Sequence, residues 1–278
     1  MKKYEKKVLK IISIIICIMI SFSGCGIYQD TIDLDYSDEI TEEYDSINSN
    51  EEDPNIENKN QNIANGNIIF GMNVFKEMNS EDSDKNIIIS PYSLFNAFGM
   101  VYNGADTKTK SELGKLLDIK GINDIDFQKG SQYLTKATNL REGVKLNIAN
   151  GLFINEVYKI NESFIDLNKN TYDAEVELLD FANTKSVDVI NGWAEEKTEG
   201  LIKEVIEELN ISNVMVLMNA IYFNGDWELK FDKAKIDTYT NLNGEKTNIE
   251  LMVRYEDTEY MKNDDYRSVR LPYKGDES

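Results

Sequence analysis

The stretch Val214-Met215-Val216-Leu217-Met218-Asn219-Ala220-Ile221-Tyr222-Phe223 decides the fold of this chain. It is almost entirely apolar and lies between the polar pairs Ser212-Asn213 and Asn224-Gly225. Because a continuous apolar run bounded by turn-forming residues is typical of a strand covered on both faces, we expect a central strand here. Asn219 interrupts the run, and a buried amide must find hydrogen-bond partners. This position is therefore the strongest candidate for a special role, although a locally satisfied structural amide would fit the same pattern.

The segments on either side of this strand predict an α+β body. Alternating apolar residues predict a long strand with one buried side over residues 144–154, and Val176 with Leu178 predicts another. Short strands should follow residue 239, with a hairpin turn at Asn243-Gly244. Helices are expected over residues 65–78, after the capping pair Ser90-Pro91, over 109–117, around 164–172 and around 187–193. The helices are thus concentrated early in the chain.

The composition removes most familiar chemistries. The 278 residues include 50 acidic and 30 basic side chains, for a net charge of −20, with two cysteines and no histidine. Such a chain is not expected to bind nucleic acid, because counterion release requires clustered Lys and Arg. Without histidine there is no Ser-His-Asp or Cys-His arrangement, and zinc loses its commonest nitrogen ligand. We therefore assign no catalytic, cofactor-binding or metal-ligating residue and expect a protein that is not an enzyme.

Residues 1–24 have the organisation of a secretory signal. A lysine-rich start is followed by an apolar run over residues 11–22, which is shorter than the about 17–25 residues of a membrane-spanning helix. Phe22-Ser23-Gly24-Cys25 resembles the cleavage box of bacterial lipoproteins, in which the cysteine is lipidated. We expect lipidation of Cys25, which places the protein outside the cell, tethered to the bacterial cell membrane. An ordinary signal followed by an incidental cysteine is the alternative and would give a secreted protein.

Residues 25–65 predict a disordered acidic stalk. Residues 26–65 contain 12 Asp or Glu against the single Lys59, with few large apolar side chains. Such a segment cannot bury enough surface to offset the entropy lost on ordering. The folded domain is therefore expected over residues 66–278.

Several ordered motifs in residues 66–278 resemble the serpin family. They are Ser90-Pro91-Tyr92-Ser93-Leu94 with Gly104-Ala105, Ala149-Asn150, Asp180-Phe181, Ile190-Asn191 with Trp193, Thr198 with Gly200, Asn219-Ala220-Ile221-Tyr222-Phe223 with Trp227, and Leu271-Pro272-Tyr273 with Gly275. The resemblance implies a serpin-like α+β fold, in which several N-terminal helices pack on a large central mixed β-sheet. Smaller sheets accompany it, and the fold is incomplete at the C-terminus. The run Ile87-Ile88-Ile89 would belong to a buried strand before a helix.

The resemblance implies a suicide inhibitor of serine, or else cysteine, proteases. In this family the protease attacks an exposed C-terminal loop, which then inserts as an extra strand in the large sheet. Ser90, Ser93 and Asn219 correspond to the shutter, the small polar residues under the opening sheet. Trp227 corresponds to the breach, where insertion begins. The match stops before the reactive-site loop, so no residue of this chain is assigned to it.

Two features depart from the family, and two other interpretations stay open. Leu201 stands where the family usually has lysine, and no histidine can partner the shutter. The chain can be a non-inhibitory surface lipoprotein acting as a binding module, or a decayed gene product, with self-association through open sheet edges. An enzymatic interpretation rests on the pairs Glu195-Glu196 and Glu207-Glu208, but adjacent carboxylates on a helix do not face each other.

Overall fold

The computed structural model describes residues 12–21, 56–81, 86–138, 144–231, 233–241, 243–255 and 257–274. Its centre is a four-stranded mixed sheet with the order β1-β4-β2-β3. The strands are β1 (Ile12–Ser21), β4 (Asn213–Gly225), β2 (Val144–Asn155) and β3 (Ala174–Leu179). Strands β1 and β2 both run antiparallel to β4, and β3 runs parallel to β2. The predicted central strand is confirmed, since every residue over 213–220 is buried.

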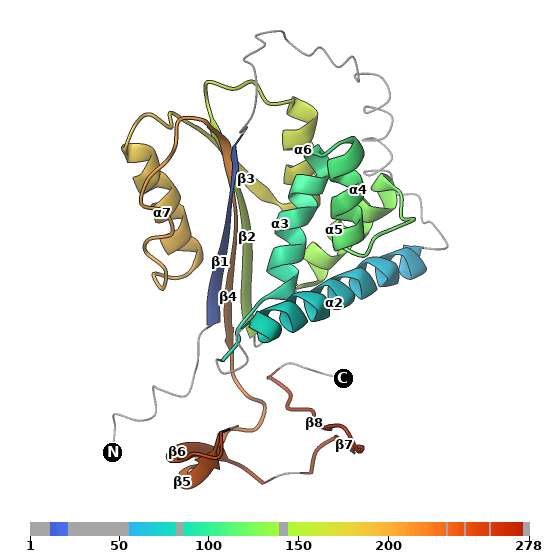
Figure 1. The fold of residues 1–278 in the computed structure, drawn as a ribbon, viewed down its shortest axis with the longest axis vertical. Coiled ribbons are helices and arrows are strands. Elements are labelled where there is room, and N and C mark those ends of the chain that lie inside the picture. Colours follow the sequence, from blue (N-terminus) through green and yellow to red (C-terminus); the bar gives the residue numbers. More distant parts are fainter. Residues whose placement is uncertain are drawn as a thin grey trace.

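Helices cover both faces of this sheet (Figure 1). One face carries α2 (Ile56–Glu81), α3 (Pro91–Gly104), α4 (Thr107–Leu116), α5 (Asp124–Thr138) and α6 (Glu162–Tyr172), and the other carries α7 (Lys185–Lys197). Alternation along β4 divides its side chains between two apolar clusters. Met215 and Leu217 pack with Ala97 and Met100 of α3, whereas Val216 and Met218 pack with residues of α7. The predicted α+β class with early helices is confirmed.

Helix α2 begins at Ile56 and therefore includes residues that the sequence analysis assigns to the stalk. One apolar side chain of this polar segment is packed inside the helical layer. Ile63 is fully buried and lies against Gly130 of α5, where a Cβ would come within 2.4 Å of the Ile63 side chain. Ile63 thus packs closely against α5 at a glycine, a contact that composition alone does not indicate.

The sequence pattern also fails to indicate α5. Its buried face carries Phe127 together with the polar Gln128, Ser131 and Thr135, so no apolar stripe marks it. Expectations for the other helices agree with α3, α4, α6 and α7 to within a few residues. None of the helices described here is long and apolar enough to cross a membrane.

Two small antiparallel pairs follow the sheet at one end of the molecule (Figure 1). They are β5 (Lys233–Thr240) with β6 (Lys246–Val253), and β7 (Tyr260–Lys262) with β8 (Arg267–Val269). The predicted hairpin turn is confirmed between β5 and β6, where Gly244 has a φ of +81°. Asn241 and Glu245 close this turn through a backbone hydrogen bond of 2.9 Å.

Two segments differ from expectation. Residues 86–90 belong to no strand in the described part of the chain, and Ile88 is 66% exposed, so the implied buried strand is not formed there. Residues 12–21, expected as the apolar core of a signal, form β1 beside β4. Both roles depend on the same property of the segment. An uncharged run rich in β-branched isoleucine is compatible with a paired strand and also with the apolar interior of a membrane.

Candidate functional site

Asn219 lies in the middle of β4, fully buried, and its amide contacts the neighbouring strand. Asn219 Nδ2 donates a hydrogen bond of 2.7 Å to Asn150 Oδ1 of β2, and the two residues are directly opposite in the register. Asn150 Nδ2 in turn donates to the backbone carbonyl of Tyr172, also at 2.7 Å. Two successive side-chain hydrogen bonds therefore connect β4 to β2 and β2 to the end of α6.

One hydrogen-bond acceptor of the Asn219 side chain is not used. Its Oδ1 is buried without a hydrogen-bond partner among the described side chains, and the same holds for the hydroxyl of Ser93. Buried polar atoms without partners are uncommon in folded proteins because each costs roughly 1–3 kcal/mol. The centre of the sheet thus contains buried polar groups whose hydrogen-bonding capacity is only partly used.

Ser93 and Asn219 face the same layer. Ser93 is fully buried on the stripe of α3 that continues through Ala97 and Met100, and these two side chains pack with Leu217. Asn219 is two residues beyond Leu217 and therefore on the same side of β4. Ser93 and Asn219 are therefore both buried in the layer between α3 and the sheet.

Ser90 has a different local task. It is the N-cap of α3, and its hydroxyl accepts a hydrogen bond of 3.3 Å from the backbone amide of Ser93, with Pro91 in the first turn. This confirms the predicted cap. Ser90 is thus linked to Ser93 through the first turn of α3 and not through the sheet.

Trp227 follows the end of β4 and lies in an aromatic cluster with Tyr273 and Phe231. Its ring stacks on that of Tyr273 with centroids 4.5 Å apart, and it meets Phe231 edge-on at 5.8 Å. The Arg254 guanidinium lies 4.8 Å from the Phe231 centroid. Trp227 is not brought together with Asn219, since the two lie in the middle and beyond the end of β4. The cluster ties the segment after β4 to residues near 273.

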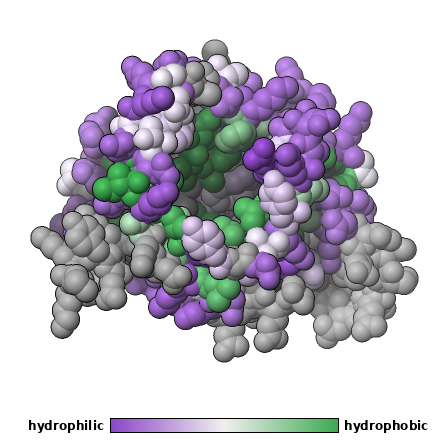
Figure 2. Space-filling model, turned by 90° about the horizontal axis from the view of Figure 1, so that it is seen from below, coloured by the Kyte–Doolittle hydropathy of each residue, from purple (hydrophilic) through white to green (hydrophobic). Residues whose placement is uncertain are grey.

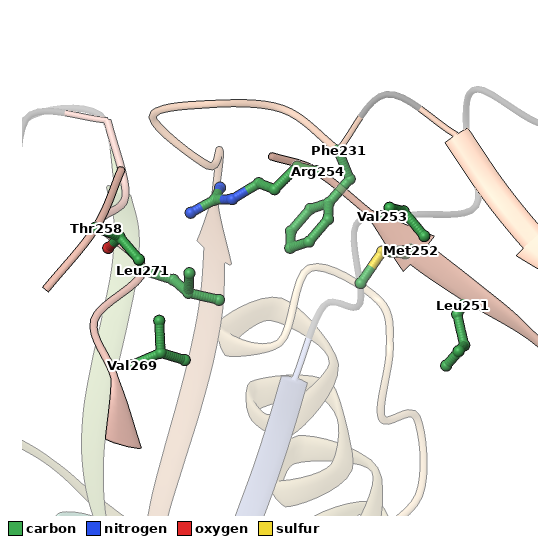
Figure 3. Close-up of a pocket in the computed structure, with 8 residues that line it drawn as sticks. All are labelled: Phe231, Leu251, Met252, Val253, Arg254, Thr258, Val269 and Leu271. Carbon is green, nitrogen blue, oxygen red and sulfur yellow. The ribbon is translucent and has the colours of Figure 1, made fainter. Parts of the chain in front are cut away.

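A pocket of about 340 Å³ lies beside this cluster. Its walls come from strands β6 and β8 and from residues next to the two small β-pairs: Phe231, Leu251, Met252, Val253, Arg254, Thr258, Val269 and Leu271. Figure 3 shows Phe231 on one side and Val269 with Leu271 on the other, all directed into the space between them. The surface on this side of the molecule is hollowed, with hydrophobic residues gathered inside the hollow (Figure 2). The pocket lining includes no carboxylate or amine.

The connection from α7 to β4 is fastened back onto the helix. Asn191 of α7 donates from Nδ2 to the carbonyl of Ile206 at 2.9 Å, and its Oδ1 accepts from the amides of Val205 and Ile206. Thr198 accepts from the amide of Ile202 at 3.1 Å. Residues 199–212 thus return along α7 before β4 begins. Asn191 and Thr198, which belong to the motifs named above, hold this connection against the helix.

Two ionisable groups near the centre of the sheet have shifted pKa values with clear structural causes. Burial raises the pKa of the Tyr172 hydroxyl, which lies against Gly99 of α3. A hydrogen bond from Lys145 of β2 to Glu199 raises the pKa of Lys145, and this pair joins the sheet to the α7–β4 connection at 2.5 Å. No cluster of three or more His, Cys, Asp or Glu that could hold a metal lies within the part of the chain that the structure describes.

Sequence reasoning assigned no site role to Asn150, although a signal for it existed. Residues 144, 146, 148, 152 and 154 are apolar and share one side of β2, and the gap at 150 is an asparagine. The interruption at Asn219 is the same pattern on β4. Only the register shows that the two gaps are opposite each other. Cys25 lies outside the described residues.

Comparison with known proteins places this geometry in a family. The family model for Serpin (serine protease inhibitor) matches residues 65–278, and the chain therefore belongs to the serpin family. An uncharacterized serpin-like protein of Methanosarcina acetivorans is 32% identical over 221 residues, which is 77% of this chain and 51% of that protein. Serpin B7 of Homo sapiens is 37% identical over 186 residues, covering 62% of this chain and 49% of serpin B7.

Solved serpin structures have the same fold. Cleaved kallistatin complexed with heparin superposes with a TM-score of 0.72 at 25% identity, over 78% of this chain and 66% of that one. Tengpin, a thermophilic serpin in the latent state, gives a TM-score of 0.65 at 30% identity, over 74% of this chain and 56% of tengpin. The chain spans about half the length of the curated relatives that it matches.

Proposed function

We propose that this chain is the N-terminal part of a suicide inhibitor of proteases that acts by strand insertion. In this proposal a protease nucleophile attacks a peptide bond of the reactive loop, the amine leaves, and an acyl-enzyme remains. The acylated loop then adds a strand to the large sheet and carries the protease with it. The protein acts through its conformation and is not an enzyme, and serine proteases are its expected targets.

The observation that carries the proposal is the Asn219–Asn150 hydrogen bond in the centre of the sheet. A sheet that must open and close at one place needs its facing groups to exchange partners there. Side-chain amides can do this, because Asn219 Oδ1 and the Ser93 hydroxyl are buried with bonding capacity left over. In the proposal, the resemblance to the family assigns Ser90, Ser93 and Asn219 to the shutter and makes Trp227 the place where insertion begins.

The proposed location follows from the sequence. A lysine-rich start, an apolar run and Cys25 favour export and lipid attachment, so the inhibitor would face proteases outside the cell while tethered to the membrane. Secretion without an anchor is the alternative.

The test begins with the protein recovered from its source cells. Its intact mass and C-terminal peptide are measured first, and the lipid on Cys25 is sought in the N-terminal peptide. The product is then incubated with trypsin-like, chymotrypsin-like and elastase-like serine proteases. We expect a complex that survives SDS with one of them and does not form with the same protease lacking its active-site serine. Cleavage of the protein without any such complex would contradict the proposal.

A second candidate is a non-inhibitory binding module. It is favoured by the apolar pocket between the two small β-pairs, which has the lining of a docking site and no acid–base pair. In that case the recovered protein would end without a further loop, and no protease would be trapped.

A further inference from the structure

One face of α3 is polar and lies against both α5 and α6. Its members recur every three or four residues and are Tyr92, Asn96, Gly99 and Asn103. Tyr92 donates a hydrogen bond of 3.2 Å to Thr135 of α5. Asn103 donates one of 3.0 Å to Asn168 of α6. The three helices therefore meet along this face, and we call their contact the polar seam.

Helix α5 lines the polar seam with polar side chains. Gln128, Ser131 and Thr135 recur on one face of α5, and each is at most 8% exposed. Gln132, beside them, donates a hydrogen bond of 3.0 Å to the backbone carbonyl of Asn170 in α6. Because Thr135 bonds to α3 and Gln132 to α6, this face of α5 is directed between the two other helices.

Helix α6 ends in the polar seam. Thr171 and Tyr172 lie three and four residues after Asn168, so they share the face of α6 that bonds to α3. A Cβ at Gly99 of α3 would come within 2.2 Å of the Tyr172 hydroxyl oxygen, which places this hydroxyl directly against α3. The backbone carbonyl of Tyr172 accepts the hydrogen bond from Asn150, so the same residue joins the polar seam to the centre of the sheet.

Five polar atoms of the seam are buried without a hydrogen-bond partner among the described residues. They are Asn96 Nδ2, Gln128 Oε1, Ser131 Oγ, Thr171 Oγ1 and the Tyr172 hydroxyl oxygen, all from residues that are at most 6% exposed. Burying a polar atom without a partner is costly, and folded proteins rarely leave one unpaired. Five such atoms in one contact between helices therefore indicate a partner other than the described side chains.

The hydrogen-bonding capacities of these atoms define the partner. Burial raises the pKa of the Tyr172 hydroxyl, and the nearby Ser131 hydroxyl acts in the opposite direction. The two hydroxyls are thus close together, although no direct hydrogen bond joins them. Each hydroxyl can donate and accept, whereas Gln128 Oε1 only accepts and Asn96 Nδ2 only donates. The partner must therefore be small, uncharged and able both to donate and to accept.

We propose that the polar seam is a binding site for ordered water, with at least one water molecule shared by Ser131 Oγ and the Tyr172 hydroxyl. Water fits because it donates and accepts, and a buried water typically makes about three hydrogen bonds to groups of this kind. An apolar ligand would leave the five atoms unsatisfied, and an ion would bring an unpaired charge into the seam. The bound water fixes the side chain of Tyr172, whose carbonyl is bonded to Asn150. This holds whether or not the protein inhibits a protease.

A high-resolution crystal structure of the full natural chain tests the proposal directly. We expect a water oxygen within about 3.2 Å of both Ser131 Oγ and the Tyr172 hydroxyl, with a further partner among the other three atoms. A direct hydrogen bond between Ser131 and Tyr172, or any arrangement without water between these two hydroxyls, would overturn the proposal.

Matched tyrosine variants give a second measurement in solution. Tyr172→Phe removes the buried hydroxyl and keeps the ring, whereas Tyr133→Phe removes a hydroxyl from a side chain of α5 that is 54% exposed. Magnetic relaxation dispersion counts the waters that stay bound for longer than the protein tumbles. We expect Tyr172→Phe to lose at least one such water and Tyr133→Phe to lose none.

Ser131→Ala removes the other hydroxyl that shares the proposed water, and it should lose the same water as Tyr172→Phe. It also keeps the test decisive if Tyr172→Phe does not fold. Equal numbers of long-lived waters in the natural chain and in the folded seam variants would contradict the proposal. No protease enters either measurement, so the outcome is independent of the proposed inhibition.

Discussion

Strands β3 and β4 of the same sheet differ in length, charge and burial, and therefore in whether their outer side needs a partner strand. β3 is short, and its Glu175 is held by Trp193 Nε1 at 2.8 Å and by Lys197 Nζ at 2.6 Å, both from α7. Leu178 of β3 is 63% exposed. β4 is long, uncharged and buried on both faces, and its outer side is covered by β1. The difference teaches that a charged, short strand is complete as an edge, whereas an apolar, long strand depends on a partner.

The largest expected effect contrasts the two strands directly. Leu217→Ala in β4 removes a fully buried side chain and should lower the free energy of unfolding by about 3 kcal/mol, since the cavity cannot be filled by neighbours. Leu178→Ala in β3 should change it by less than about 0.5 kcal/mol. Urea denaturation of the unprocessed chain measures both. Similar losses of unfolding free energy in the two variants would mean that the two leucines contribute equally to stability, contrary to the difference in their burial.

A smaller effect is expected at the polar centre of β4. Asn219→Leu leaves Asn150 Oδ1 buried without its donor and should cost about 2 kcal/mol of unfolding free energy. Asn150→Leu should cost more, because it also removes the bond to the Tyr172 carbonyl. In the double variant the losses should fall short of their sum by at least about 0.5 kcal/mol. Strict additivity would show that the two amides do not act together. Glu177→Gln on exposed β3 is the control and should be neutral.

The smallest effect concerns the charged edge at β3. The hydrogen bond to Glu175 raises the pKa of Lys197, while partial burial opposes it. A raised native pKa gives a stabilisation that is fully present below the unfolded-state lysine pKa and is lost as pH rises through the native value. For this solvent-screened pair we expect at most about 1 kcal/mol. The urea midpoints of the natural chain and Lys197→Met should differ at about pH 8, and the difference should shrink at a pH above the unfolded-state lysine pKa of about 10.4.

Two measurements show whether the effect of Lys197→Met comes from the lost charge or from the lost packing of the side chain. Lys203→Met is the control, since Lys203 is mostly exposed and lies 3.5 Å from Glu195. It should leave the midpoint unchanged at both pH values. A difference for Lys197→Met that persisted at high pH would assign the effect to the packing of the lysine stem against the sheet.

Periodicity predicted the elements whose own side chains alternate or repeat. β2, α6 and α7 were identified in this way, because each carries apolar residues at the spacing of its own geometry, whereas β4 was identified by its nearly continuous apolar run. α5 was not, because Gln128, Ser131 and Thr135 are buried by neighbouring helices despite their polarity. The start of α2 was placed too late because its first residues are polar in composition, although Ile63 among them packs against Gly130.

The candidate site was predicted to the same extent. Asn219 was found because it interrupts an apolar run, and Ser90 because it precedes Pro91 at a helix start. Asn150 needed the register, and the burial of Ser93 needed the packing of α3 on the sheet. Interruptions of a pattern are visible along the chain, but which interruptions meet is a property of strands that lie far apart in sequence.

The sequence by itself determined the acidic, histidine-free composition, the central strand and the serpin motifs, because these depend on residue type and on spacing within one element. Tertiary structure decided that Asn219 bonds to Asn150, that Trp227 stacks on Tyr273, and that residues 12–21 lie beside β4. The physical reason is that an apolar run specifies only that it must be covered. Which surface covers it depends on the edges and faces that the rest of the fold leaves open.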